Sequence, residues 1–288
     1  MVAAVADIID LLDLIAPPVL AEDWDNAGLQ IGDSRWTVRK VGVALDASME
    51  VVEAACTMHV DLLVTHHPLI FKPLVSIDCQ TSIGSIVQKA LQHRLAIFAV
   101  HTNLDKTRGG LNDVLARRIG LLNCTVLKAV KIEDDNRLML NSASDESVTL
   151  KRLHNQEGFG RVWTLSNAMH LQDFARAVKQ KLNLDFIKIV GRPDLVIRKA
   201  AVCTGSGSDL LKTFFSSGAQ VYISGDLKFH DARDVEAADL GMIDIGHFSS
   251  EYIVVDSLVK RLTELISQNR LEVDVGACGT EKDPFVTV

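Results

Sequence analysis

Apolar residues along the chain follow two spacings, and each predicts a different kind of element. Short apolar runs bounded by polar or glycine-rich residues are typical of strands. On this basis we assign strands at 40–45, 62–65, 96–100, 162–165, 186–190, 200–203, 220–224, 242–245 and 272–275. Apolar residues three or four positions apart instead predict amphipathic helices. These occur at 2–15, 48–57, 81–92, 111–119, 170–182, 208–215, 231–240 and 249–268.

The order of these elements indicates the fold class. Strands alternate with helices over most of the chain, which indicates an α/β fold with a mostly parallel sheet and helices on its faces. Between 127 and 153 the pattern weakens, because polar Thr149 and Lys151 alternate with apolar neighbours. We expect antiparallel or exposed strands in that segment.

Two parts of the chain share one arrangement of strands and helices. The segment 41–65 can be laid on the segment 200–224, and the two are equally long. A chance match is the alternative, because all β-α-β units look alike, but the polar residues at the strand ends coincide too. We therefore predict an internally duplicated protein, with an N-terminal α/β domain at 1–127 and a second α/β domain at 128–288.

Each repeated unit continues with a helix, a strand and a histidine that a carboxylate follows four positions later. The first pair is His101 and Asp105, and the second is His247 and Glu251. Two related halves packed about a pseudo-dyad would bring both pairs to one cleft. His247 and Glu251 could also share one face of a helix that begins near Phe248.

Two adjacent histidines follow another predicted strand. The segment 61–71 reads DLLVTHHPLIF, and its strand should stop at His66 and His67 because Pro68 cannot continue a ladder. In open α/β sheets, ligands bind at the carboxyl ends of strands. The two side chains leave the strand in different directions and could reach two metal ions. The alternative is one core histidine and one solvated histidine.

The histidines and carboxylates at strand ends form a set of metal ligands. Imidazole suits zinc, iron, cobalt, manganese and nickel, and carboxylates extend this range to harder ions. A carboxylate can bridge two cations through its two oxygens, and two cations about 3.5–4 Å apart can activate a water molecule. For each residue alone, the alternative is a helix cap or a surface ion pair.

Two loops leave their roles open. The glycine-rich segment 203–209 follows a strand and opens a helix, so its backbone N–H groups could face a phosphate. A tight turn with Ser208 as the helix N-cap is at least as good an explanation. The segment 21–32 reads as a loop in which Trp24 either packs for stability or lies at the edge of a site.

Composition narrows the protein class. The chain has 288 residues, a formal net charge of −7 and a pI near 5.7, which argues against a nucleic-acid surface. No apolar run is long enough to span a membrane, and the N-terminus does not resemble a signal peptide. Five scattered cysteines fit free thiols in a reducing cytoplasm, where we expect the protein to reside.

Five motifs in this order resemble the Nif-three-like family, whose members are also called GTP cyclohydrolase I type 2 homologs. They are WDNAGLQIG at 24–32, THHP at 65–68, HTNLD at 101–105, GGLND at 109–113 and GHFSSE at 246–251. The resemblance implies two interlinked α/β domains and a toroidal homohexamer. Asp105 and His247 are 142 positions apart, too few for the domain that some members insert, so the chain resembles the compact form.

The resemblance also implies a dinuclear site with two divalent ions, which could be Zn, Fe, Mn, Co, Ni or Mg. His67 and Asp105 would bind one ion. His66 and His247 would bind the second, and Glu251 would bridge the two.

Two classes of function follow from this site. One is a metal-dependent hydrolase that opens the imidazole ring of GTP with release of formate, in which His101 would shuttle the proton. A phosphoesterase acting on another nucleotide would use the same residues. The other class is a non-catalytic, metal-binding regulatory or interaction protein. We expect self-association and a small-molecule substrate, with a nucleotide as one candidate, and no membrane partner.

Overall fold

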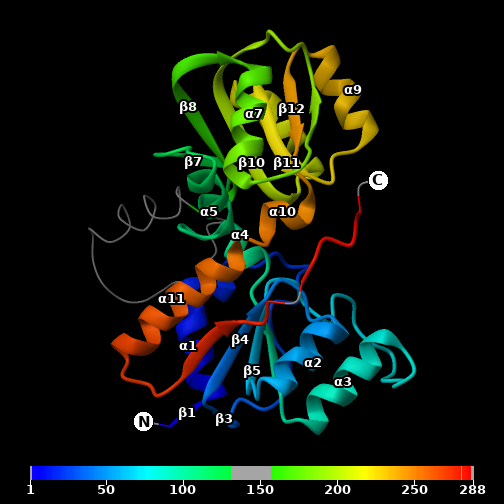
Figure 1. The fold of residues 1–288 in the computed structure, drawn as a ribbon, viewed down its shortest axis with the longest axis vertical. Coiled ribbons are helices and arrows are strands. Elements are labelled where there is room, and N and C mark those ends of the chain that lie inside the picture. The colour runs from blue at the N-terminus through cyan, green and yellow to red at the C-terminus, as the bar shows by residue number, and fades with distance from the viewer. Residues whose placement is uncertain (1, 131–156, 280, 287–288) are drawn as a thin grey trace. The chain divides into compact units, whose positions relative to one another are not determined.

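The computed structural model describes residues 2–130, 157–279 and 281–286 (Figure 1). The chain packs into two compact units, residues 1–104 with 252–288, and residues 105–251. This division differs from the expected one at 127/128, because the C-terminal helix returns to the first unit and packs there against the N-terminal helix. Most of the segment 127–153 lies outside the described residues.

The first unit is built on a five-stranded sheet in the order β13-β4-β5-β6-β2. Four strands are parallel and the edge strand β2 is antiparallel to β6. Both β5 and β6 are fully buried, as continuous apolar runs predict. The strand bounds are β2 (Gly28–Ile31), β4 (Lys40–Ala44), β5 (Leu62–Thr65), β6 (Ala96–Ala99) and β13 (Asp274–Ala277).

Helices cover both faces of this sheet. Helices α2 (Met49–Thr57) and α3 (Ser82–Gln92) lie on one side, and α1 (Val5–Ile15) and α11 (Val254–Gln268) lie on the other (Figure 1). Ser48 is the N-cap of α2 and accepts a hydrogen bond from a first-turn N–H, and Thr81 does the same for α3. The remaining elements are β1 (Ala3–Ala4), paired with β3 (Thr37–Val38), and the 3-10 helix η1 (Pro18–Leu20).

The second unit is built on a six-stranded sheet in the order β7-β8-β10-β11-β12-β9. Strands β10, β11 and β12 are parallel, and the other three are antiparallel to their neighbours. The strands are β7 (Thr125–Ala129), β8 (Gly158–His170), β9 (Lys188–Val190), β10 (Val196–Ser206), β11 (Val221–Gly225) and β12 (Gly241–Asp244). The helices are α5 (Leu111–Arg118), α7 (Leu171–Leu182), η3 (Ser208–Leu210), α8 (Leu211–Ser217), α9 (Phe229–Ala237) and α10 (His247–Glu251). Helix α4 (Thr102–Lys106) contains the first boundary between the units.

Several predicted elements differ from the structure. The predicted helix at 208–215 is the 3-10 helix η3 followed by α8, and the predicted loop at 21–32 contains β2. The predicted strands at 162–165 and 200–203 are only parts of β8 and β10, because glycine, charged and polar residues extend each strand beyond its apolar run. The predicted helix at 249–268 is two helices, α10 and α11, because the α-helix is interrupted at 252–253. Glu251 therefore ends a short helix and does not lie in the first turn of a long one.

The two units repeat one topology. In each, three parallel strands alternate with two helices, β4-α2-β5-α3-β6 and β10-α8-β11-α9-β12. In each, an antiparallel strand, β2 or β9, pairs with the third parallel strand. This repetition is what an internal duplication would produce, and the duplication itself stays a prediction. Among the described residues, no helix has the length and apolar character needed to cross a membrane.

Candidate metal centre

Three imidazoles gather at the carboxyl ends of two neighbouring strands in the first unit. Strands β5 and β6 pair in parallel with Thr65 opposite Ala99, so the residues that follow them emerge at one edge of the sheet. The ring centroids of His66, His67 and His101 lie 4.9, 5.3 and 5.6 Å apart. One ring nitrogen from each lies within 4.8 Å of the others. This geometry suits a cation.

Hydrogen bonds fix which nitrogen of each histidine of the pair could bind a metal. Nδ1 of buried His66 lies 2.8 Å from the Val100 carbonyl oxygen, and Nδ1 of His67 lies 2.9 Å from Oδ1 of Asp46. Oxygens of these kinds can only accept, so each Nδ1 donates, and the lone pair of each neutral ring is on Nε2. Proteins orient metal-binding histidines in this way.

His101 is oriented by a buried carboxylate. Its Nδ1 donates to Oδ1 of Asp25 at 2.7 Å, and the Asp25 side chain is 0% exposed. Burial tends to raise the pKa of Asp25, but hydrogen bonds from His101 and Thr102 outweigh it and lower the pKa to about 2. Asp25 is therefore a permanent acceptor. From the sequence, Asp25 is predicted only to lie in a loop, and its place in the WDN motif is the one local signal of its role.

In the second unit, His247 and Glu251 form a pair on α10, as their spacing predicts. Nε2 of His247 lies 2.9 Å from Oε2 of Glu251, and its Nδ1 donates to Oδ2 of Asp226 at 2.7 Å. The hydrogen bond to Glu251 is the main reason why the pKa of His247 rises to about 9; burial opposes the rise and Asp226 adds to it. The surroundings of this imidazole thus favour a positive charge.

Two buried carboxylates accompany this histidine. Asp105 is 8% exposed and Glu251 is 4% exposed, and carboxylate oxygens of the two lie within 4.8 Å of each other. Burying two such anions together is costly unless protons or a cation offset their charge. Oxygen and imidazole donors of this kind suit zinc, iron, manganese, cobalt and nickel. The residues of the second unit therefore fit a divalent cation.

The glycine-rich segment 203–209 makes room for Glu251. A Cβ atom on Gly205, whose φ is +62°, would lie 2.2 Å from Oε1 of Glu251. The backbone N–H of Gly205 donates to Oγ of Ser250 at 2.8 Å, so it is committed within the protein rather than presented to a phosphate. The prediction that Ser208 is the helix N-cap is wrong, because Gly207 occupies that position and Ser208 is the first residue of η3. The Ser208 hydroxyl donates to Oδ2 of Asp231 at 2.5 Å.

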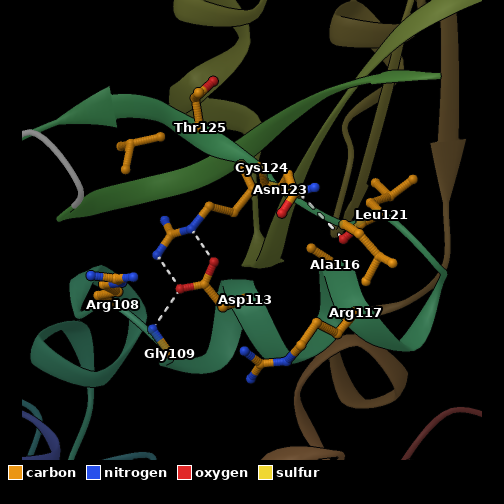
Figure 2. Close-up of a pocket in the computed structure, with 12 residues that line it drawn as sticks. Arg108, Gly109, Asp113, Ala116, Arg117, Leu121, Asn123, Cys124 and Thr125 are labelled. Carbon is orange, nitrogen blue, oxygen red and sulfur yellow. Dashed lines mark hydrogen bonds and ion pairs between the residues drawn. The ribbon is translucent and has the colours of Figure 1, made fainter. Parts of the chain in front are cut away.

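A cavity of about 850 Å³ lies beside α5 and β7 of the second unit (Figure 2). Its wall includes Asp113 of the GGLND motif, which accepts two hydrogen bonds from the buried guanidinium of Arg161 and one from the Gly109 N–H. Arg108 and Arg117 also line it. Guanidinium groups repel cations, so this cavity is not a metal site, and Asp113 serves to hold Arg161.

Known proteins are similar to this chain over nearly its whole length. A "GTP cyclohydrolase 1 type 2 homolog" of Clostridium perfringens is 30% identical over 281 residues, covering 97% of both chains. One of Bacillus subtilis is 28% identical over 362 aligned positions, covering 96% of this chain and 97% of the relative. That alignment is longer than this chain of 288 residues, so the relative has residues that this chain lacks, as expected of a compact form.

Solved structures share the fold over the whole chain. The crystal structure of a Bacillus cereus protein related to NIF3 has a TM-score of 0.88 at 27% identity and covers 100% of both chains. Reduced HcgD from Methanocaldococcus jannaschii has a TM-score of 0.74 at 27% identity and covers 97% of this chain and 99% of its own. Residues 3–284 match one family throughout, and the chain is a member of the Duf34/NIF3 (NGG1p interacting factor 3) family.

Proposed function

We propose that the protein is a metal-dependent hydrolase with two divalent cations. His67 and Asp105 bind one ion, His66 and His247 bind the other, and Glu251 bridges them. The main support is the cluster of imidazoles in the first unit, where His66, His67 and His101 each place a ring nitrogen within 4.8 Å of the others. In these three histidines and in His247 the Nδ1 is hydrogen-bonded to an acceptor, which leaves Nε2 as the atom that could face an ion. The exposed histidines His93 and His170 also bond through Nδ1, so the clustering of the ring nitrogens, and not the Nδ1 bond alone, carries the argument.

The position of the two carboxylates in the chain supports the same assignment. Asp105 and Glu251 are the first and the last residue of the second unit. Both therefore lie where the chain passes from one unit to the other. A bridging Glu251 would also account for the glycine at 205, since a side chain there would displace the carboxylate.

The reaction that fits these residues is attack by water on an electrophilic carbon or phosphorus. Two bound cations would supply an activated water and stabilise developing negative charge. His101 would transfer the proton at Nε2, because Asp25 fixes its Nδ1 as a donor. The relatives' names point to GTP as substrate, so the ring-opening reaction with release of formate is the first to test. A nucleotide phosphoester is the second.

A non-catalytic role is the competing proposal, and one observation favours it. The family description refers to an interacting factor, which names a protein contact rather than a reaction. In that case the ions would be structural or regulatory. The homohexamer that we expect from the family resemblance would then serve as a platform for partners.

Metal analysis and product analysis together test the proposal. Protein purified without chelator should contain about two ions per chain, and incubation with GTP and Zn, Mn, Fe or Co should release formate detectable by mass spectrometry. His66→Ala should lower the metal content and abolish turnover. The matched control is His93→Ala, because His93 is an exposed histidine of the first unit whose Nδ1 bonds only to the Lys89 carbonyl. Two ions without turnover of GTP or nucleotide esters would favour the non-catalytic role.

A further inference from the structure

Two exposed aromatic side chains stand beside the imidazoles of the first unit. Trp24 is 59% exposed and Phe71 is 48% exposed. Their rings meet edge to face, with centroids 5.9 Å apart and planes at 66°. Both also meet the ring of His101 edge to face, at 6.2 and 6.3 Å. The pair thus forms an aromatic wall next to His101.

The backbone that holds this wall is anchored. Asp25, next to Trp24, is buried and hydrogen-bonded to His101. The segment before Phe71 is tied to the residues that follow Trp24, since Nδ2 of Asn26 donates to the Ile70 carbonyl at 2.6 Å and the Ile70 N–H donates to the side chain of Gln30 in β2 at 3.2 Å. The two rings therefore lie on ordered loops that are fixed relative to His101.

Fold stability does not explain why Trp24 lies here. Most of its surface faces solvent, whereas Trp36 in the same unit is half-buried and stacks under the guanidinium of Arg94 at 5.1 Å. A tryptophan that only stabilised its loop would gain most by burial. An exposed aromatic pair beside metal-binding side chains instead offers apolar, π-rich surface to a molecule that reaches those side chains.

We propose that Trp24 and Phe71 form a ring-binding subsite that takes the planar heteroaromatic part of the ligand beside His101. A planar heterocycle fits because it can stack on one ring and meet the other at its edge, whereas an aliphatic group would gain only apolar contact. The subsite extends the proposed function, because it assigns a binding position to the ring of the substrate. The subsite rests on that function for its role, but ring binding requires no turnover.

Binding measurements with two nucleotides and with the sugar phosphate that lacks their base test this subsite. The probes are guanosine 5′-monophosphate, adenosine 5′-monophosphate and ribose 5-phosphate, titrated calorimetrically into metal-loaded and metal-stripped protein. Trp24→Ala and Phe71→Ala should each weaken both nucleotides by roughly 5- to 100-fold and leave ribose 5-phosphate unchanged. Trp24→Phe should retain most of the affinity, because it keeps a π face.

The matched control is Val75→Ala, because Val75 is a fully exposed apolar residue of the same loop that makes no ring contact. It should change nothing. Equal weakening of all three probes by Trp24→Ala, or no measurable binding of either nucleotide to the native protein, overturns the subsite. A change of particle mass by light scattering in Trp24→Ala also overturns it, since the wall would then be a subunit interface. Nucleotide binding that depends on Trp24 without any turnover would reject the hydrolase and keep the subsite.

Discussion

The two units place a histidine at the same point of the same topology but hold it in different ways. His101 follows the third parallel strand of the first unit, and His247 follows that of the second. Asp25, from a distant loop, orients His101, whereas Asp226, at the end of the neighbouring strand β11, orients His247. The first unit also has an aspartate at a strand end, Asp46 after β4, but this residue orients His67 and not His101. A repeated fold therefore reproduces strand ends but not the partners of each side chain.

The donors differ as well. The first unit offers three imidazoles, which can lie together as neutral groups without a metal. The second unit gathers two buried carboxylates around one imidazole, and the raised pKa of His247 indicates that this set needs a positive charge. We infer that a metal-free state destabilises the carboxylate set of the second unit far more than the three imidazoles of the first.

Glu251→Gln should have the largest effect. It keeps the side-chain volume and removes the charge of the proposed bridge, so affinity for both proposed ions should fall by more than the roughly 10–100-fold typical of residues that only orient a ligand. His66→Ala should weaken chiefly one ion. Competition with a chromophoric chelator measures both, and circular dichroism checks the fold. Full two-metal occupancy in Glu251→Gln would show that Glu251 is an ordinary helix carboxylate.

Gly205→Ala should come next, because its Cβ would lie 2.2 Å from Oε1 of Glu251. We expect metal affinity to fall about 10- to 100-fold and the unfolding temperature to drop by a few degrees. Gly109→Ala is the matched control, since Gly109 has a similar φ of +73° and no atom within 4 Å of the added Cβ. It should lower stability by about 1 kcal/mol and leave metal affinity unchanged. Equal metal affinity in the two variants would contradict the role of Gly205.

Asp46→Ala and Asp226→Ala compare the strand-end aspartates of the two units. Each removes the acceptor that orients a histidine of the proposed metal site, His67 or His247, and should lower metal affinity about 10-fold. Asp226→Ala should also lower the pKa of His247 in the metal-stripped protein, because Asp226 contributes to its rise. Titration of the histidine NMR signals measures this. An unchanged pKa would mean that Glu251 alone controls His247.

The smallest effect should be a pH dependence confined to the metal-stripped protein. The pKa of His247 is about 9 in the folded state, against about 6.5 when unfolded. A raised pKa stabilises the fold fully below pH 6.5, and the contribution is lost as pH rises through 9. Urea unfolding at pH 6.5, 8 and 9.5 should show this loss, which His247→Gln should remove. Metal-loaded protein that loses the same stability over this range would contradict an ion at Nε2.

The sequence alone determined the parts of the site that depend on local order. Apolar runs identified the parallel strands of both units, and Pro68 set the end of β5, so the positions of His66 and His67 followed. The four-residue spacing of His247 and Glu251 was enough to pair them, because one helical turn decides it. The motifs then identified the family, which residues 3–284 confirm.

Only the tertiary structure decided how these side chains are held. Asp25 is 76 residues from His101, and Asp46 and Asp226 are each 21 residues from their histidines, so no local pattern connects them. The role of Gly205 likewise depends on α10 packing against β10. The effect of a hydrogen-bond acceptor or of a missing Cβ depends on the group that lies beside it. That neighbour is chosen by strand pairing and helix packing, which join residues far apart in the chain.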